Sequence, residues 1–186
     1  MHDFNLIEDG DKVLIAVSGG KDSSVLLMEL ASRMGKFLPN CEIGAIHIQS
    51  DFADKAPREF LQRMAEQYSQ IPFFFKDVAV EGRKLNCYWC STQRRTELIK
   101  FARENGYNKI ALGHHMDDIV ETLLMNMLYK GEFSDMPPMV PYEKYPCSII
   151  RPLCYCEEIK SLTKGNSTLK ANLFESMRNI RMDYLL

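Results

Sequence analysis

Two hydrophobic patterns alternate along the chain. Short apolar runs rich in β-branched and aromatic residues indicate strands, and longer stretches with apolar residues three or four positions apart indicate helices. The expected strands are 13–17, 43–48, 72–75, 109–112 and a short one beginning at 149–150, and the expected helices are 22–34, 57–69, 92–105 and 117–129. Alternating strands and helices predict an α/β fold, a single doubly wound parallel sheet of about five strands with flanking helices.

Proline and glycine positions refine these boundaries. Pro57 suits the first residue of its helix, because its missing N–H would have no partner there. Gly106 suits the carboxyl-terminal cap of the helix before it. The proline-rich stretch 136–146 reads as a loop within the domain and not as a linker between domains.

Small and polar residues follow several of the expected strands. The run Ser18-Gly19-Gly20-Lys21-Asp22-Ser23 comes directly after the first strand, His47 and Gln49 end the second, and residues 113–115 follow the fourth. Ligands of parallel sheets bind at the carboxyl ends of the strands. These positions are therefore the first candidates for a site.

The run 18–23 has the properties of a phosphate cradle. Its two glycines permit a sharp turn and a close approach of a ligand to the backbone. The N–H groups of the turn and of the helix start then point at one spot, where the helix dipole favours an anion. The spacing differs from the GxxxxGK[ST] P-loop. An ordinary glycine turn capped by Ser18 or Asp22 is the alternative, and the preceding strand and the length of the motif favour nucleotide binding.

A second cluster, Leu-Gly-His-His-Met-Asp-Asp at 112–118, again lies between a strand and a helix. Asp117 and Asp118 in a first helical turn could simply complement the helix dipole. Beside a phosphate cradle, either carboxylate could instead hold the Mg²⁺ that neutralises ATP phosphates. Glu121, one turn further on, could orient that group or be a solvated helix residue.

Cys87 and Cys90 form a Cys-x-x-Cys motif, followed by Arg94 and Arg95. One such motif supplies only half of the ligands of a tetrahedral metal site. The two cysteines could therefore bind zinc, bind an iron–sulfur cluster or form a redox pair. The alternative is that they are buried, inert thiols. Arg94 could reach a phosphate, or pair with the carboxylates of residues 97 or 104. Cys154 and Cys156 are two positions apart and would point to opposite sides of an extended segment.

Composition limits the classes of protein. The 186 residues suffice for one α/β domain, and the 46% hydrophobic and 26% charged content is that of a soluble globular protein. No apolar stretch is long enough to span a membrane, and the first residues lack the layout of a signal peptide, so we expect a cytoplasmic protein without membrane contact. Six cysteines in such a chain favour metal or redox chemistry over a disulfide framework.

The net charge of −2 neither requires nor excludes a nucleic acid partner. A polyanion-binding protein concentrates its basic residues on one face, which only a folded structure can show. The candidates for such a patch are Arg58, Arg63, Arg83, Lys84, Arg94 and Arg95.

Four segments together resemble one known family. They are SGGKDS at 18–23, CYWCSTQRR at 87–95, LGHHMDDIVETLLMNMLYKGEFSDMPP at 112–138 and RPLCYC at 151–156. The pattern is similar to that of the tRNA 2-thiocytidine-forming sulfurtransferases of the PP-loop ATP pyrophosphatase superfamily. The resemblance extends, with gaps, from about Val13 to Glu157. It implies an adenine nucleotide alpha-hydrolase-like PP-loop domain over 1–186 with a C-terminal helical tail.

The resemblance also implies a reaction. ATP binds at the PP-loop, O2 of an anticodon-loop cytidine attacks the α-phosphate, pyrophosphate leaves, and sulfur then displaces AMP. It implies a [4Fe–4S] cluster held by three cysteines, two of which match Cys87 and Cys90. The implied partners are tRNA, a sulfur donor such as a cysteine desulfurase, and a second copy in a homodimer.

Residue matching gives the expected site. Asp22, Arg94 and Asp118 are the expected catalytic residues, and Lys21 is added for its charge, which could stabilise the leaving pyrophosphate. The positions that match ATP contacts in the family are Ala16, Ser18, Gly19, Gly20, Asp22, Ser23, His47, Arg94, Gly113 and Asp118.

The chain departs from the family pattern after RPLCYC. Family members carry a second Cys-x-x-Cys there, which supplies the third cluster ligand. Here the sequence passes almost at once into the family's C-terminal pattern, which begins at Thr168, so a segment of the family pattern is missing near 161–167. Either the segment is lost, and Cys147, Cys154 or Cys156 must substitute, or the printed sequence omits it. Both flanks keep the family pattern, which favours omission.

Two other functions stay open. One is a PP-loop pyrophosphatase or ligase that acts on another tRNA base or a small molecule without a cluster. The other is a non-catalytic nucleotide-binding module, which the complete motifs at 18–23 and 113–118 disfavour.

Overall fold

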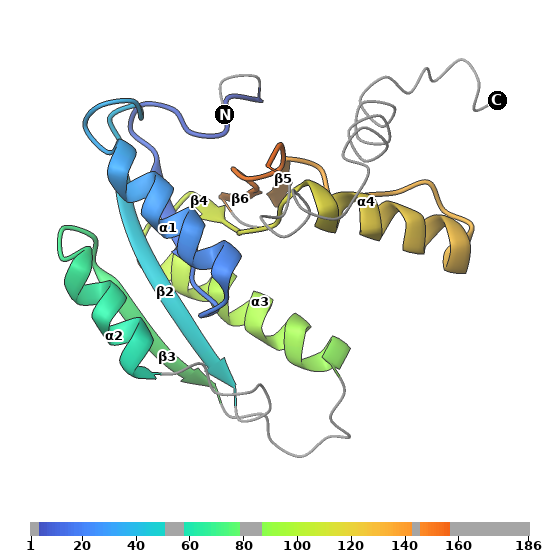
Figure 1. Ribbon diagram of the computed structural model, residues 1–186, viewed down its shortest axis with the longest axis horizontal. Helices are drawn as coiled ribbons and strands as arrows, with labels where there is room; N and C mark the ends of the chain where they lie inside the picture. The colour runs from blue at the N-terminus through green and yellow to red at the C-terminus, as the bar shows by residue number, and fades with distance from the viewer. Residues whose placement is uncertain (1–3, 51–57, 79–86, 143–145, 157–186) are drawn as a thin grey trace, which may run out of the picture. The chain divides into compact units, whose positions relative to one another are not determined.

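Figure 1 shows the computed structural model of the chain, which describes residues 4–50, 58–78, 87–142 and 146–156. The chain divides into two compact units. The first contains residues 1–113 and 138–152, and the second contains residues 114–137 and 153–186. Each unit is described below by itself.

The first unit is built on one six-stranded sheet in the order β3-β2-β1-β4-β6-β5. Neighbouring strands are parallel, except that β5 runs antiparallel to β6. The strands are β1 (Lys12–Ala16), β2 (Glu42–Ser50), β3 (Phe73–Val78), β4 (Lys109–Ala111), β5 (Met139–Tyr142) and β6 (Cys147–Ile150). The prediction of a single, largely parallel doubly wound sheet is confirmed.

The sixth strand corrects the prediction of a loop over 136–146. β5 lies within that stretch and pairs with β6, with Pro141 opposite Ser148. Proline has no N–H to donate to a neighbouring strand, so within a sheet it is found at the edge, where one side of the strand has no neighbour. β5 is the edge strand beyond β6, which explains how a proline-containing segment joins the sheet.

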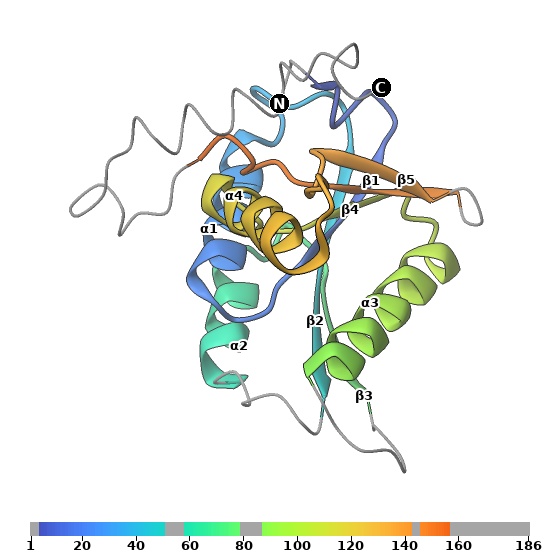
Figure 2. The same cartoon turned by 90° about the vertical axis from the view of Figure 1, so that its right-hand side faces the viewer.

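Helices cover both faces of the sheet, as a doubly wound fold requires. Figure 2 shows α1 (Lys21–Arg33) and α2 (Arg58–Gln67) on one face and α3 (Cys87–Glu104) on the other. α3 begins five residues before the predicted start at 92, so the Cys-x-x-Cys motif forms its first turn. Gly106 follows α3 in the left-handed region, with a φ of 73°, as its expected role at the helix end requires.

Alternate strand residues form the core beneath α3. Leu14, Ile46, Ile110 and Ile149 come from four neighbouring strands and pack together with Leu98, Ile99 and Ala102 of the helix. Each of these side chains is at least nine-tenths buried. Removing this apolar surface from water is the main contribution to the stability of the unit.

The second unit contains a helix in two parts. α4 (Met116–Met125) continues directly into a π-helical turn, η2 (Asn126–Lys130). The sequence predicted one regular helix over 117–129 and could not show that the last turn widens. The buried residues of α4 recur at three- and four-residue spacing and include Ile119, Val120 and Leu123.

A paired carboxylate ties α3 to the sheet. Glu97, whose side chain is 12% exposed, lies 2.9 Å from Lys76 Nζ on β3 and 2.7 Å from Lys100 Nζ on its own helix. Hydrogen bonds from Lys100 and Lys76 lower the pKa of Glu97 below its usual range. A carboxyl group with a lowered pKa stabilises the folded state above its unfolded pKa, and this stabilisation is lost as the pH falls through the lowered value.

We therefore expect Glu97→Gln to reduce the free energy of unfolding by about 1 kcal/mol at pH 7. The difference from the unmodified chain should begin to shrink near about pH 4, where the carboxyl group of the unfolded chain becomes protonated, and should vanish only as the pH falls through the lowered pKa of the folded state. Urea unfolding at a series of pH values measures it, with the exposed Glu104→Gln as the control on the same helix. A difference that persists undiminished at pH 3 would contradict a charge-based origin.

Candidate nucleotide-binding site

The loop between β1 and α1 is closed by two glycines. Gly19 has a φ of 88°, in the left-handed region where a side chain is strained. Gly20 is the N-cap residue of α1 and makes no side-chain hydrogen bond to the helix. The N-cap residue of α1 is thus neither Ser18 nor Asp22, although Ser18 Oγ accepts the Gly20 N–H within the turn. A helix start of this kind presents backbone N–H groups and the positive end of a dipole to an anion.

Hydroxyl groups fix the shape of this loop. Ser23, 5% exposed, donates its single proton to the Gly20 carbonyl at 3.0 Å and accepts the Ser18 N–H at 3.1 Å. The two hydroxyl oxygens of Ser18 and Ser23 are also 3.0 Å apart. Because the Ser23 proton is already committed, the Ser18 hydroxyl must donate in that bond. Ser18 Oγ then accepts the Gly20 N–H at 3.3 Å.

His47 ties the end of β2 to the start of the loop. Its Nδ1 lies 2.7 Å from the carbonyl oxygen of Val17, so Nδ1 carries a proton and donates it. Its Nε2 lies 3.3 Å from Oε1 of Gln49. Gln49, which the sequence places with His47 at the end of this strand, matches no ATP contact in the family, and its position two residues from His47 puts both on one face of the strand.

Gly113, at the end of β4, lies directly against the first turn of α1. A Cβ at this position would be 2.9 Å from the Ser23 nitrogen and 3.0 Å from the Asp22 carbonyl carbon. Real Cβ atoms do not approach backbone so closely, so the position accepts only glycine without movement. The structure therefore brings together the loop 18–23, His47 and Gly113 from three neighbouring strands, as the sequence predicted.

The second unit contains the Asp117 and Asp118 pair, where His115 caps α4. The His115 N–H donates to Asp118 Oδ2 at 2.9 Å, and the Asp118 N–H donates to His115 Nδ1 at 3.4 Å. This reciprocal capping box gives Asp118 a structural role beside the expected one. Asp117 is only 4% exposed, with its Oδ2 3.7 Å from His115 Nδ1. Magnesium binding by either carboxylate stays a prediction.

Arg94 and the Cys-x-x-Cys motif lie in the first half of α3. The chain leaves α3 at the amino end of the sheet, because Asn108, four residues after the helix, donates its N–H to the carbonyl of Lys12 at the start of β1. The first turns of α3 therefore lie toward the carboxyl edge of the sheet, where the loop 18–23 is. Arg94 is partly buried, and the Glu97 carboxylate, one of its alternative partners, is held by Lys76 and Lys100. No measured contact joins Arg94 to the loop, so its role stays a prediction.

The other cysteines differ in their surroundings. Cys147 belongs to the hydrophobic core of the first unit, at the amino end of β6, and Cys154 is 1% exposed. Burial raises the pKa of both thiols, which disfavours the thiolate that a metal needs. Cys156 is exposed. Within the described part of the chain, no three His, Cys, Asp or Glu side chains group into a metal site.

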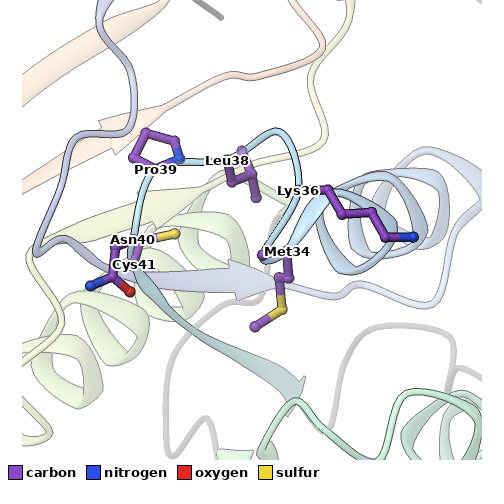
Figure 3. Close-up of a pocket in the computed structure, with 7 residues that line it drawn as sticks. Met34, Lys36, Leu38, Pro39, Asn40 and Cys41 are labelled. Atoms are coloured by element: carbon purple, nitrogen blue, oxygen red, sulfur yellow. The ribbon is translucent and has the colours of Figure 1, made fainter.

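A pocket of about 270 Å³ lies at the other end of α1 (Figure 3). It is lined by residues 34–36 and 38–41, which join α1 to β2. Half-buried Cys41 borders it, and burial, followed by the negative charges of Asp11 and Asp9, raises the pKa of its thiol. The pocket is at the amino end of β2 and is therefore not part of the nucleotide-binding site.

A doubly wound sheet with an anion cradle after its first strand defines a nucleotide-binding α/β protein. The profile of the PP-loop domain family matches residues 2–182. The chain belongs to this PP-loop family.

Two curated relatives illustrate the similarity. The tRNA-cytidine(32) 2-sulfurtransferase of Alcanivorax borkumensis is 38% identical over 190 residues, which cover 96% of this chain and 66% of that protein. The tRNA-cytidine(32) 2-sulfurtransferase of Vibrio cholerae is also 38% identical, with 96% of this chain and 61% of that protein covered. The chain thus spans somewhat less than two thirds of the length of these relatives.

Among solved structures, the U34-tRNA thiolase NcsA from Methanococcus maripaludis, with its [4Fe–4S] cluster, matches with a TM-score of 0.65. The match covers 95% of this chain and 68% of that one at 21% identity, which supports the fold. Of the helices that the structure describes, none has both the length and the apolar character to cross a membrane.

The hydrogen bonds of the Ser23 hydroxyl predict different effects of substitution at Ser23 and at its neighbour Ser24. Ser23→Ala removes a buried hydroxyl that accepts the Ser18 N–H and donates to the Gly20 carbonyl, so we expect a loss of about 1–2 kcal/mol in the free energy of unfolding. Ser24 donates one bond to the same Gly20 carbonyl and is the matched control, with an expected loss below about 0.5 kcal/mol. Urea unfolding of both variants gives the comparison. Equal losses would contradict the special role of Ser23.

Proposed function

We propose that this protein is an ATP-dependent tRNA sulfurtransferase that adenylates an anticodon-loop cytidine at O2 and replaces that oxygen with sulfur. The observation that carries the proposal is the rigid loop 18–23 at the start of α1, in a chain 38% identical to tRNA-cytidine(32) 2-sulfurtransferases. A loop of this geometry suits the pyrophosphate part of ATP.

In the first step, cytidine O2 forms a bond to the α-phosphorus, and the bond from that phosphorus to pyrophosphate breaks. Negative charge develops on the leaving pyrophosphate, where N–H groups of residues 19–23 and the Lys21 ammonium can stabilise it. Arg94 would supply a second positive charge from α3. We assign Asp22, Arg94 and Asp118 to this catalytic group, together with ATP contacts at Ala16, Ser18, Gly19, Gly20, Ser23, His47 and Gly113.

Mg²⁺ is part of the proposal. Adenylation by ATP needs its phosphate charge neutralised, and carboxylates are the usual protein ligands of this ion. Asp117 is the candidate on α4. In the second step a bond forms between sulfur and C2, and the bond from C2 to the adenylated oxygen breaks, which releases AMP.

The chain supplies two cysteines suited to an iron–sulfur cluster. Cys87 and Cys90 are one turn apart at the start of α3, where the helix dipole favours thiolates. A bound [4Fe–4S] cluster would present sulfur to the activated carbon. Cys147 and Cys154 are buried, so Cys156 is the better third ligand if the printed chain holds the cluster by itself.

The matched lengths fit a segment that the relatives have and that this chain lacks, whether it was lost or omitted. The match to the Alcanivorax borkumensis relative is 190 residues long, whereas the whole chain has 186. At least four positions of that match therefore have no counterpart here. We propose a single PP-loop domain over 1–186, with the gap near 161–167 and with the third cluster ligand in the missing segment.

The partners follow from the reaction. The substrate is tRNA, in the cytoplasm where tRNA occurs. The sulfur comes from a donor such as a cysteine desulfurase, which carries it as a persulfide, so a thiol reductant must also supply two electrons to bring it to the sulfide level of the product. Arg58 and Arg63 lie on α2, whereas Arg94 and Arg95 lie on α3 across the sheet. RNA that contacts both groups would have to approach from the shared carboxyl edge.

We expect anaerobically purified protein, given tRNA, ATP, Mg²⁺ and a sulfide source, to form 2-thiocytidine with release of AMP and pyrophosphate. Cys87→Ala should lose iron, labile sulfide and thiolation but still release pyrophosphate, because adenylation precedes sulfur transfer. Cys41→Ala, at the opposite edge of the sheet, is the matched control. Thiolation is read by mass spectrometry of digested tRNA.

Two results separate the alternatives. A colourless protein that cleaves ATP without thiolating tRNA would contradict the proposal and favour a PP-loop enzyme with another acceptor. A Cys156→Ala variant that keeps its iron would exclude Cys156 as the third ligand. Loss of iron in that variant would assign the third ligand to Cys156.

A further inference from the structure

Phe75 on β3 is an exposed aromatic ring beside the candidate site. Its side chain is 38% exposed, although it lies within a strand of the sheet. Its register partner on β2 is His47, and the centroids of the two rings are 6.4 Å apart. His47 holds the Val17 carbonyl at the root of the loop 18–23. The exposed ring thus lies one strand beyond a residue that fixes this loop.

Two neighbours hold the ring in position. Phe73, two residues earlier on the same face of β3, has its ring centroid 5.0 Å away, at an interplanar angle of 31°. Arg58, the first residue of α2, has its guanidinium carbon 5.7 Å from the centroid of the Phe75 ring, which is a cation–π contact. A ring that is exposed and already ordered by such contacts binds a planar partner with little further loss of side-chain freedom.

We propose that Phe75 and Arg58 form a stacking subsite for a base of the tRNA, next to the cytidine that is modified. This inference rests on the proposed function, since it takes an anticodon loop as the substrate. Unstacked bases of single-stranded RNA stack on exposed aromatic rings and on the guanidinium planes of arginines. Phe75 and Arg58 bring these two kinds of group together.

The position of the ring suits a neighbour of the reacting nucleotide. Because β2 separates β3 from β1, the ring is about 10 Å from the strand that leads into the phosphate cradle. A nucleotide joined covalently to the cytidine at the cradle can reach the ring. The exposure of the ring favours RNA over the adenine of ATP, because pockets for small ligands bury most of the ligand surface.

Polar groups beside the ring suit the edge of a base. Asp77, which is exposed, follows Phe75 on the same face of β3, and its register partner is Gln49. A carboxylate accepts hydrogen bonds from the exocyclic amino group of a base, and a side-chain amide can both donate and accept. The negative charge of Asp77 disfavours a phosphate at this position, so the subsite suits a base better than the RNA backbone.

Phe75→Leu tests the stacking, because it removes the aromatic plane and keeps an apolar side chain beside His47 and Phe73. The dissociation constant of this variant for tRNA should rise about fivefold or more, whereas that of Phe75→Tyr should stay within about twofold of the unmodified chain. Phe37→Leu is the matched control and should leave the affinity unchanged, because Phe37 is 75% exposed between α1 and β2, at the opposite edge of the sheet. Filter binding of unthiolated tRNA measures these affinities. Calorimetry with a non-hydrolysable ATP analogue should show no change in any of the three variants.

The arginine gives a second readout that separates its plane from its charge. Arg58→Lys keeps the positive charge and loses the planar group, so tRNA affinity should fall about threefold or more while the salt dependence of binding stays the same. Arg63, whose guanidinium lies 3.7 Å from the Glu59 carboxylate on the same helix, supplies the control. Arg63→Lys should change neither quantity.

Three other results overturn the inference. If the unmodified chain binds tRNA and Phe75→Leu binds it equally well, the subsite is wrong and the proposed function stands. If Phe75→Leu weakens binding of the ATP analogue and leaves tRNA affinity unchanged, the ring belongs to the adenine. If the unmodified chain binds the analogue and does not bind tRNA, the proposed function itself fails, and the inference fails with it.

Discussion

The end of β4 and the first turn of α1 are so close that only a glycine fits between them. Gly113 places its Cα where any Cβ would press on the backbone of Asp22 and Ser23, at 3.0 Å and 2.9 Å. This approach fixes the start of α1 against the central strands. The hydroxyl network of Ser18 and Ser23 then sets the shape of the loop before the helix. The anion cradle is thus held by backbone packing on one side and by hydrogen bonds on the other.

The proposed chemistry depends on the positions that this packing and these hydrogen bonds give to the donor groups of the loop. Donors that stabilise charge on a leaving pyrophosphate are effective when they are already in position, because no energy is then needed to reorganise them. His47 extends the same principle to the neighbouring strand, since its Nδ1 proton holds the Val17 carbonyl at the root of the loop. The tRNA and the sulfur donor would meet a site whose phosphate-binding half is already shaped by these contacts.

Much of this arrangement could be predicted from the sequence, because it follows from local patterns. The run 18–23 after an apolar strand predicted the cradle, and the end of β4 predicted Gly113 nearby. The early start of α3 was missed, because tryptophan, tyrosine and cysteine at 87–90 carry no helical pattern of their own. β5 was missed, because proline usually argues against a strand and only its edge position permits it. The capping role of Asp118 depends on a side-chain geometry that spacing alone does not reveal.

The most direct test of the account is the affinity of the Gly113→Ala variant for a non-hydrolysable ATP analogue, measured by calorimetry on protein whose thermal unfolding is checked first. The account predicts that affinity falls about tenfold or more, that is by about 1.4 kcal/mol, because the added methyl group displaces the start of α1. A variant that binds the analogue as tightly as the unmodified chain would show that the cradle does not depend on this contact and would contradict the account.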